Sequence, residues 1–442
     1  MSKKLPTVSK YEVFRNRKQI LKNPLPFHKK HFENLGDIFK VEISFGRNVI
    51  FTRNANIIRH ALQQNHKNYR KSELQTVDLA RYIGKGILTA EGEHWRAHRR
   101  MIQPAFHKKK LHLLLDTMIA VIRQELERIE TGKAKDIFPL MGDLAFQVVA
   151  QSLFSRDDIR KRMNRLQEIT ELNQQMLIRE MRQPYLKWYF RLSGKIRRHL
   201  DLAEQGRDIL NGIIEERIES GEERDDLLDM LLQARYEDGS AMSREQLIDE
   251  VLILFTAGHE TTANALSFVL FLLASNPAKQ EKLYLEVKTV DWKDNDALEL
   301  LGKLPYTKQC IEEALRLYPP VYVIDRVANE QDEVEGVSLQ PNTLLLMSIY
   351  ELHRSKEFWE RPEEFIPERF DPEQKLNSSA YYYPFGAGPR MCVGNNFAMY
   401  EMVMVLSMLV KDYHISTPQQ SLELNPLISM KPGRVMLEFF RR

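Results

Sequence analysis

Cysteine is scarce in this chain, with only Cys310 and Cys392 among 442 residues. Two thiols cannot build a disulfide scaffold or a thiolate-bound iron–sulfur cluster, and the chain has no CxxC pair of the kind a zinc finger needs. So few cysteines also favour a reducing compartment, and we expect a cytoplasmic protein.

An excess of either charge sign is also lacking. The 64 Lys and Arg residues nearly balance the 61 Asp and Glu residues, which leaves a formal net charge of +3. This balance excludes an acidic disordered tail and a histone-like basic protein. Because no aromatic platforms alternate with the basic residues, we expect no nucleic-acid partner.

Long apolar runs of the membrane-spanning kind are not evident either. The first thirty residues are dense in Lys and Arg and have no apolar core, which argues against a signal peptide or an anchor. The stretch from Thr261 to Ala278 is free of charge, but it contains Asn264, Asn276 and Pro277. A buried core helix explains it better than a membrane span, so we expect no membrane partner.

Helical periodicity dominates what is present. Apolar residues recur at spacings of three and four over 115–129, 209–218 and 227–232. The longest helix is predicted from Ser243, which has Gln246 three residues on as a capping box, to the break at Pro277, a length of about 50 Å. The chain is therefore predicted to be one domain, residues 1–442, mainly α with a minor β portion.

Strand patterns are few. The segments 41–46 and 49–53 are predicted to form a hairpin that turns at Arg47 and Asn48, and 342–349 and 434–440 are further strand candidates. The acid-rich segment 215–226 is predicted to be a solvated helix face with a turn at Gly221.

Two familiar motifs are incomplete. Gly386-Ala387-Gly388 begins like a dinucleotide-binding loop, but Met391 occupies the place of the third glycine. His259-Glu260 begins like a zinc-protease helix, but Ala263 stands where the second histidine must be. Neither chemistry can be built from these residues.

One loop is specialised around a cysteine. The sequence Phe385-Gly386-Ala387-Gly388-Pro389-Arg390-Met391-Cys392-Val393-Gly394 comes directly before an apolar helical run. Glycines let a backbone approach something bulky, and a helix N-terminus with a nearby Arg390 favours a thiolate over a thiol. A buried, inert cysteine is the alternative, and it suits Cys310 better than Cys392.

This loop resembles the signature F-x-x-G-x-R-x-C-x-G of the cytochromes P-450, the haem-thiolate monooxygenases. Further elements follow in the family's order: Trp95, Arg96 and Arg99 as W-R-x-x-R; Ala257-Gly258-His259-Glu260-Thr261 on the long helix; Glu313 with Arg316 as E-x-x-R; and Pro367-Glu368-Arg369-Phe370. The resemblance is to soluble bacterial members, and it implies the P-450 fold with a long central helix over a buried haem and no fused reductase.

The resemblance implies a role for each of these residues. Cys392 would be the axial ligand of the iron of haem b, and a thiolate in that place favours O–O cleavage. The two propionates would need cations or donors, and the other residues would contact the haem. The propionate group is Trp95, Arg99, Arg326 and Arg390; the remaining contacts are Phe385, Gly386, Gly394 and Ala257.

On the long helix, the resemblance implies that Thr261 hydrogen-bonds dioxygen and that Glu260 relays protons. Gly258 beside them predicts a local opening of the helix. Glu313, Arg316 and Arg369 are implied to form a buried charged network that supports folding and haem retention, not the chemistry.

Electrons for a P-450 of this type would come from NAD(P)H through a separate ferredoxin and ferredoxin reductase. A basic cluster near the W-R-x-x-R segment is a candidate docking surface for an acidic carrier. It comprises Arg96, Arg99, Arg100, Lys108, Lys109 and Lys110. Two alternatives stay open: a peroxide-driven peroxygenase, against which the Glu260–Thr261 pair argues, and a non-catalytic haem gas sensor.

The substrate is predicted only as a small or medium organic molecule, hydroxylated at a C–H bond or oxidatively O-demethylated. Polar groups in the expected lining slightly favour an oxygenated molecule, and fatty acids and terpenoids stay open. The expected lining is Ser72, Glu73, Gln75, Thr76, Asp78 and Arg81; the stretch from Asn173 to Tyr189, with Asn173, Gln174, Gln175, Arg179 and Gln183; Phe255 and Ala257; Val321 to Ile324; and Ile428 and Ser429.

Overall fold

The computed structural model describes residues 4–44, 47–156, 159–292, 296–376 and 379–442. These residues divide into two compact units, each built from separate stretches of chain. Unit 1 comprises Met1–Ser72, Gln309–Cys392 and Leu422–Gly433, and unit 2 comprises Glu73–Lys308, Val393–Ser421 and Arg434–Arg442. The predicted class, mainly α with a minor β portion, is confirmed.

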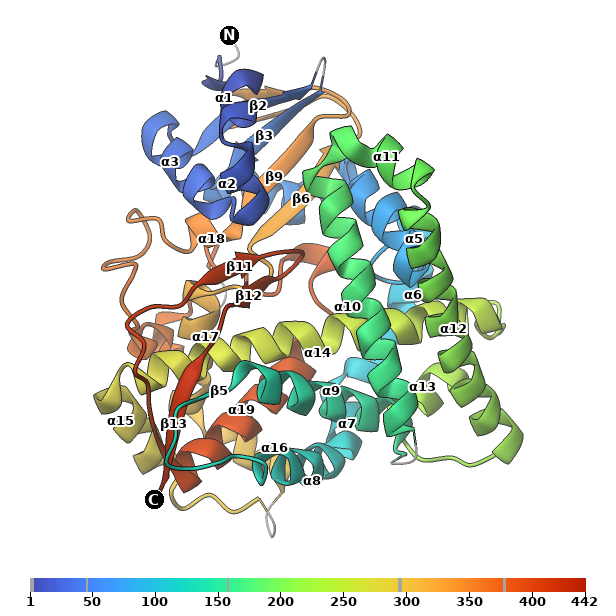
Figure 1. Ribbon diagram of the computed structural model, residues 1–442, viewed down its shortest axis with the longest axis vertical. Helices are drawn as coiled ribbons and strands as arrows, with labels where there is room; N and C mark the ends of the chain where they lie inside the picture. The colour runs from blue at the N-terminus through green and yellow to red at the C-terminus, as the bar shows by residue number, and fades with distance from the viewer. Residues whose placement is uncertain (1–3, 45–46, 157–158, 293–295, 377–378) are drawn as a thin grey trace. The chain divides into compact units, whose positions relative to one another are not determined.

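Unit 1 is built around a twisted sheet in which the strand order is β1-β2-β3-β9-β6-β4. Its neighbouring strands β2, β3, β9 and β6 lie side by side in Figure 1. The strands of unit 1 are β1 (Thr7–Val8), β2 (Ile38–Ser44), β3 (Arg47–Thr52), β4 (Tyr69–Arg70), β6 (Val323–Ala328), β7 (Asp332–Val334), β8 (Val337–Leu339), β9 (Leu344–Ser348), β11 (Leu424–Pro426) and β12 (Met430–Pro432).

The predicted hairpin is β2 and β3, paired antiparallel with Phe39 opposite Phe51. The two rings stack with their centroids 5.4 Å apart in a core between the sheet and α3 (Leu25–Leu35), which places the alternating apolar residues inside. The prediction of a turn at Arg47 and Asn48 is wrong, because β3 already begins at Arg47. The link between the strands falls on residues 45–46, outside the described residues.

Short helices and one longer helix complete unit 1. The longer helix, α17, begins in unit 2 at Pro305 and continues into unit 1. The helical segments are α1 (Lys10–Arg15), α2 (Arg17–Lys22), α4 (Ala55–Arg59), η1 (His60–Gln64), η2 (His66–Asn68), α17 (Pro305–Leu317), α18 (Ile349–Leu352), η7 (Pro367–Phe370), η8 (Pro372–Gln374) and η10 (Gly388–Arg390).

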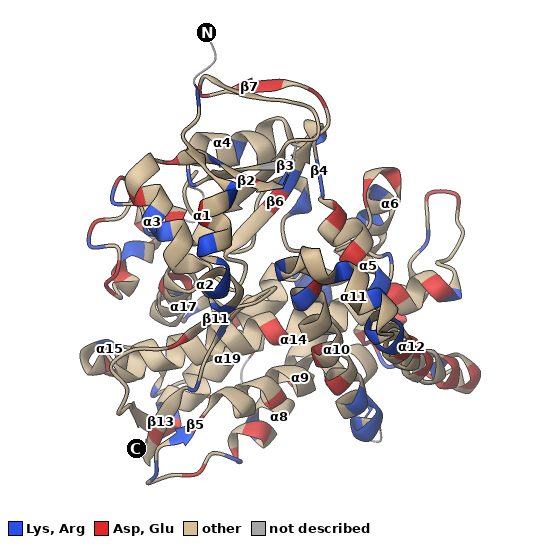
Figure 2. Ribbon diagram, turned by 45° about the horizontal axis from the view of Figure 1, so that its top comes forward, with Lys and Arg blue, Asp and Glu red and all other residues tan. Residues whose placement is uncertain are grey.

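Unit 2 is a helical bundle around α14 (Arg244–Ala274), which packs against α9, α12 and α19 (Figure 1). The ribbon of α14 is largely free of charged positions in Figure 2, whereas charged positions crowd α12. Its helices are η3 (Leu74–Leu79), α5 (Ala80–Ile83), α6 (Gly92–Ile102), η4 (Gln103–Phe106), α7 (Lys108–Leu111), η5 (His112–Leu114), α8 (Leu115–Leu126), α9 (Phe138–Phe154), α10 (Arg160–Arg182), η6 (Pro184–Leu186), α11 (Lys187–Leu192), α12 (Lys195–Ser220), α13 (Leu227–Gln233), α15 (Pro277–Val287), α16 (Ala297–Gly302) and α19 (Asn395–Asp412). Its strands β10 (Tyr413–Ser416), β13 (Met436–Arg441) and β5 (Lys135–Asp136) form a small sheet.

The long helix begins as its sequence predicts. The Ser243 hydroxyl accepts the N–H of Gln246, and the Gln246 side chain accepts the N–H of Ser243, which completes the capping box. The helix ends at Ala274, three residues before Pro277, which itself opens α15. The predicted extent of this helix is confirmed to within three residues.

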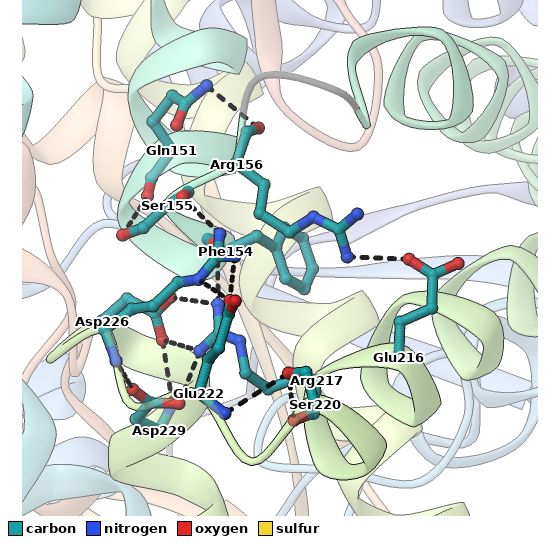
Figure 3. Close-up of polar contacts among 11 residues, drawn as sticks. Gln151, Phe154, Ser155, Arg156, Glu216, Arg217, Ser220, Glu222, Asp226 and Asp229 are labelled. Atoms are coloured by element: carbon teal, nitrogen blue, oxygen red, sulfur yellow. Dashed lines mark hydrogen bonds and ion pairs between the residues drawn. The ribbon is translucent and has the colours of Figure 1, made fainter.

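A buried charge cluster joins α9, α12 and α13 (Figure 3). The Arg217 guanidinium donates at 2.7 Å to Asp226, also donates to Asp229, and reaches the carbonyl of Phe154 at 2.6 Å. Burial alone would lower the pKa of Arg217, but the two carboxylates raise it above its ordinary value. Gly221 ends α12 in the left-handed conformation as predicted, but Arg217 and Asp226 are buried. The prediction that the whole of 215–226 is solvated is therefore wrong.

Candidate haem-thiolate site

The Cys392 loop is closed by a backbone bond and shaped by glycine. The N–H of Cys392 donates to the carbonyl of Phe385 at 2.9 Å. Gly386 and Gly388 have φ of 71° and 69°, a region that side chains rarely adopt. A Cβ on Gly388 would also lie 2.0 Å from the carbonyl oxygen of Leu62, so this position tolerates no side chain. The resulting loop presents Cys392 as an exposed thiol, whereas Cys310 is buried.

Two of the predicted cations lie in the same unit as Cys392. Arg390 donates from Nη1 to the carbonyl of Tyr69 at 2.9 Å, which ties the cysteine loop to β4. Arg326 is buried, with 7% of its surface exposed, and its Nη1 donates to the carbonyl of Asp325 at 2.7 Å. A buried guanidinium needs anionic or polar partners, which suits the propionates expected for this residue.

Trp95 and Arg99 lie on α6 in unit 2. Their spacing of four residues places both side chains on one face of that helix. Trp95 is buried, and the Arg99 Nε donates to Gln103 at 3.2 Å. The aromatic N–H and the guanidinium are both donors that suit a carboxylate.

The long helix α14 is buried almost throughout, and its exceptions lie together. From Leu247 to Ala274, the residues that keep accessible surface are Leu254, Ala257, Gly258, Glu260 and Thr261. Positions 254, 257, 258 and 261 follow the helical spacing i, i+3, i+4 and i+7 and so form one stripe. Ala257 is the most accessible of them, although alanine in a core helix is ordinarily covered. Unit 2 thus leaves one face of this helix available to a bound group.

The chain stays helical through Gly258, where a local opening was predicted. Residues 244–274 form one unbroken α-helix, and the Thr261 hydroxyl donates to the Ala257 carbonyl at 3.0 Å. Thr262 makes the same contact with Gly258. Gly258 instead serves close packing, because a Cβ there would lie 3.2 Å from Val149 on α9. Threonine hydroxyls that bond to the carbonyl four residues earlier often bend a helix without ending it.

The structure brings Glu313, Arg316 and Arg369 together in unit 1. Arg316 donates to both oxygens of Glu313, at 2.7 and 2.9 Å, and neither side chain has exposed surface. Arg369 reaches Glu313 at 3.3 Å, and burial lowers the pKa of its guanidinium. Arg316 also donates to the backbone carbonyls of His353, Pro362 and Glu364. Arg369 also donates to the backbone carbonyls of Glu360 and Arg361.

His353 adds a neutral group to this network. Its Nε2 accepts the N–H of Tyr383 at 2.9 Å, so that nitrogen carries no proton. Burial, followed by the charge of Arg316, holds the pKa of His353 well below its ordinary value. The network therefore gathers several segments of unit 1 around one buried carboxylate.

The polar side chains expected to line a substrate pocket are largely engaged within the protein. Arg81 donates to Asp78 at 2.6 Å and to Glu180 at 3.1 Å, and Lys187 donates to Asp78 at 3.2 Å. Similarly, Ser72 donates to Asp325, and His199 contacts the Asn173 side chain at 3.1 Å. Because these polar groups already bond within the protein, they favour an oxygenated substrate less than the sequence suggests.

The expected lining segments of unit 1 do lie close together. The N–H of Met430 donates to Pro320, and the Tyr322 hydroxyl donates to the Leu427 carbonyl at 3.0 Å. Val321 and Ile428 remain exposed while Ser429 is buried. Val321 and Ile428 are therefore two accessible aliphatic side chains on neighbouring segments of unit 1.

The basic cluster predicted around α6 is partly neutralised. Arg96 pairs with Glu93, and Arg100 pairs with Glu237. Lys108, Lys109 and Lys110 lie exposed on α7. The positive surface is therefore concentrated on α7 and not on α6.

Within the described part of the chain, no helix is long and apolar enough to cross a membrane. No group of three or more His, Cys, Asp and Glu side chains there is placed to hold a metal ion.

Comparison with known proteins agrees with this geometry. A sequence profile described as Cytochrome P450 matches residues 5–439, which is nearly the whole chain. The chain belongs to the cytochrome P450 family. As a member, it is a haem-thiolate monooxygenase, and P450 enzymes use haem, redox partners and organic substrates.

Similar P450 proteins come from bacteria and animals alike. The putative cytochrome P450 132 of Mycobacterium tuberculosis is 28% identical over 420 residues, covering 88% of this chain and 86% of that protein. Cytochrome P450 4d2 of Drosophila melanogaster is 30% identical, covering 88% and 83%. Human cytochrome P450 4V2 is 30% identical, covering 78% and 71%. The similarity does not separate a bacterial from an animal type.

The residues of this P450 also fit a haem on structural grounds. An exposed thiol on a glycine-shaped loop supplies a suitable axial ligand, and a buried Arg326 in the same unit supplies a cation. The features that could not be predicted from the sequence are buried pairs between distant segments, above all His98 with Glu250. The W-R-x-x-R pattern marks the helix that carries His98, but it does not indicate Glu250 as the partner of His98.

Proposed function

We propose that this P450 uses Cys392 as the axial ligand of haem b and inserts one oxygen atom of O₂ into a small or medium organic substrate. The exposed Cys392 thiol on its closed, glycine-shaped loop is the observation that carries the proposal. When bound, the haem supplies oxygen activation, which a thiolate ligand favours. The product is a hydroxylated or O-demethylated molecule, and the second oxygen atom leaves as water.

The chain's own residues hold the haem and supply protons. Trp95, Arg99, Arg326 and Arg390 hold the propionates, and Phe385, Gly386, Gly394 and Ala257 contact the macrocycle. Ala257 belongs to the accessible stripe of α14, so it presents a small apolar surface where a flat ring needs close approach. Glu260 and Thr261, on the same stretch, relay protons toward oxygen.

Electrons are proposed to come from NAD(P)H through a separate ferredoxin and its reductase, in the cytoplasm. The exposed Lys108, Lys109 and Lys110 on α7 support docking of an acidic carrier. Attraction of this kind weakens as salt screens the charges.

The source of electrons separates this function from its alternatives. We expect product from substrate when NADH, ferredoxin and reductase are supplied, and far less from hydrogen peroxide alone. Peroxide is already reduced and protonated, so an enzyme driven by it would not need the proton relay that Glu260 and Thr261 supply. Product formation can be followed by mass spectrometry with ¹⁸O₂, which labels the product only in the first case. Product from peroxide only would indicate a peroxygenase, and ligand binding without product would indicate a gas sensor.

Thr261→Ala is expected to divert reducing equivalents into hydrogen peroxide while haem binding survives. The hydroxyl lies on the accessible stripe of α14, and its loss removes a proton donor without disturbing the buried faces. The measurement is peroxide released per NADH consumed.

Thr262→Ala is the matched control for this substitution. Thr262 makes the same hydroxyl-to-carbonyl contact one residue later, at 3.0 Å, but its side chain is buried. We expect its coupling to match that of the wild type. Equal peroxide release from both variants would show that Thr261 has no part in proton delivery.

A further inference from the structure

A fully buried pair, His98 with Glu250, connects α6 with α14. His98 Nδ1 contacts the carboxylate of Glu250, and neither side chain has exposed surface. The two residues are 152 positions apart in sequence. Charged side chains are rarely buried to this degree unless they are paired, so the contact is a specific element of the fold.

Hydrogen-bond directions indicate which ring nitrogen of His98 carries a proton. The other ring nitrogen of His98, Nε2, lies 3.3 Å from the Tyr236 hydroxyl, which donates to the Gln246 side-chain oxygen at 3.3 Å. A hydroxyl has one proton, so it cannot donate to Gln246 and to His98 together. Both contacts are satisfied when Nε2 of His98 carries a proton and donates it to the Tyr236 hydroxyl, which leaves Nδ1 to share a proton with Glu250.

Glu250 also holds the turn that leads into α6. Its second oxygen accepts the N–H of Ile87 at 3.0 Å, and the preceding Asp249 accepts the N–H of Lys85 at 2.7 Å. Two glycines make room for these carboxylates. A Cβ on Gly84 would lie 2.1 Å from Asp249, and one on Gly86 would lie 2.7 Å from Glu250. Asp249 and Glu250, two consecutive residues of α14, thus hold the turn that precedes α6 through hydrogen bonds to its backbone.

His98 shares a helix face with the predicted propionate donors. Trp95, His98 and Arg99 follow the spacing i, i+3 and i+4, so a rotation of α6 that moved one side chain would move all three. His98 is therefore placed to set the rotation of α6 about its axis.

We propose that His98 and Glu250 are positioning residues, which lock α6 so that Trp95 and Arg99 meet the haem propionates. This inference rests on the proposed function, since it takes the roles of Trp95 and Arg99 from it. His98 and Glu250 act through the orientation of α6 and touch neither substrate nor haem themselves.

Haem transfer from the ferric holoenzyme to apomyoglobin tests the inference. Supporting groups behind a cofactor's direct contacts change its retention by about 10- to 100-fold, so Glu250→Gln should accelerate transfer by that factor. The substitution keeps the size of the side chain and an acceptor for Ile87. The reduction potential should fall at the same time, because a displaced Arg99 no longer offsets the negative propionates.

His94→Gln is the matched control. His94 lies one turn before His98 on α6, with ring centroids 4.2 Å apart, but it is exposed. We expect its haem transfer rate and potential to match those of the wild type. If Glu250→Gln does not fold, Tyr236→Phe gives a milder change, because it removes only the hydroxyl beside His98 Nε2. It should accelerate transfer to a smaller extent.

A double substitution shows whether the pair acts through α6. In an Arg99→Ala background the additional effect of Glu250→Gln on haem transfer should largely vanish, because the contact it supports is already gone. Additive effects, or a Glu250→Gln variant that retains haem like His94→Gln, would overturn the inference. Failure of the proposed function is distinguishable, since the unsubstituted protein would then lack a thiolate-type spectrum of its reduced carbon monoxide complex.

Discussion

Cys392→Ala is expected to abolish monooxygenase turnover and the thiolate-type spectrum of the reduced carbon monoxide complex. Cys392 is the exposed thiol of the chain and lies on a loop in which Gly388 leaves no room for a side chain. Without sulfur as ligand, any haem that remains bound loses the electron donation that favours O–O cleavage. Absorption spectra of the purified, reduced protein under carbon monoxide measure the first effect, and product formation measures the second.

Cys310→Ala is the control for this experiment. Cys310 is the other cysteine of the chain, buried on α17, and its loss removes a thiol without touching the loop. It should keep the spectrum and the turnover of the wild type at a small cost in stability. If Cys392→Ala keeps the thiolate-type spectrum, the ligand assignment is wrong.

Arg316→Ala is expected to have the largest effect on folding. It would leave the Glu313 carboxylate, which has no exposed surface, without its two strongest donors. Removal of one partner from a buried ion pair costs about 3–5 kcal/mol of the free energy of unfolding. It would also free the carbonyls of His353, Pro362 and Glu364, so several segments of unit 1 should loosen together. Denaturant unfolding of the apoprotein, with the fraction of haem bound after purification, measures both consequences.

An exposed ion pair provides the comparison. Lys303, the C-cap residue of α16, pairs with Glu299 one helical turn before it, with about two thirds of each side chain exposed. Lys303→Ala should change stability by less than about 1 kcal/mol, because water screens such pairs. Arg316→Lys keeps the charge but loses the planar fork that reaches several carbonyls, so it should fall between the two. An Arg316→Ala variant as stable as Lys303→Ala would contradict a supporting role for the network.

Local features of the chain were predictable because their causes are contiguous in sequence. Ser243 and Gln246 cap the long helix within one turn of chain, and alternating apolar residues place Phe39 and Phe51 inside. The Cys392 loop is recognisable for the same reason, since its glycines and its thiol occupy ten consecutive positions.

Buried charges were the main failure of prediction. Arg217 and Asp226 stand in an acid-rich segment that resembles a solvated face, yet packing of α9, α12 and α13 encloses them (Figure 3). In the same way, Asp78 and Arg81 look like ligand-binding groups in sequence, but they bond to each other and to α10 and α11. A charged residue in a helical pattern looks the same in the sequence whether its side chain faces water or pairs with another side chain.

The amino-acid sequence alone therefore determined the helical class, the ends of the longest helix and the position of the cysteine loop. Each of these depends on backbone torsions and hydrogen bonds among neighbouring residues. Only the tertiary structure decided which ionisable groups are buried and paired, such as His98 with Glu250 or Arg369 with Glu313. Such pairs join residues tens to hundreds of positions apart, and the burial that makes them strong arises only when helices pack.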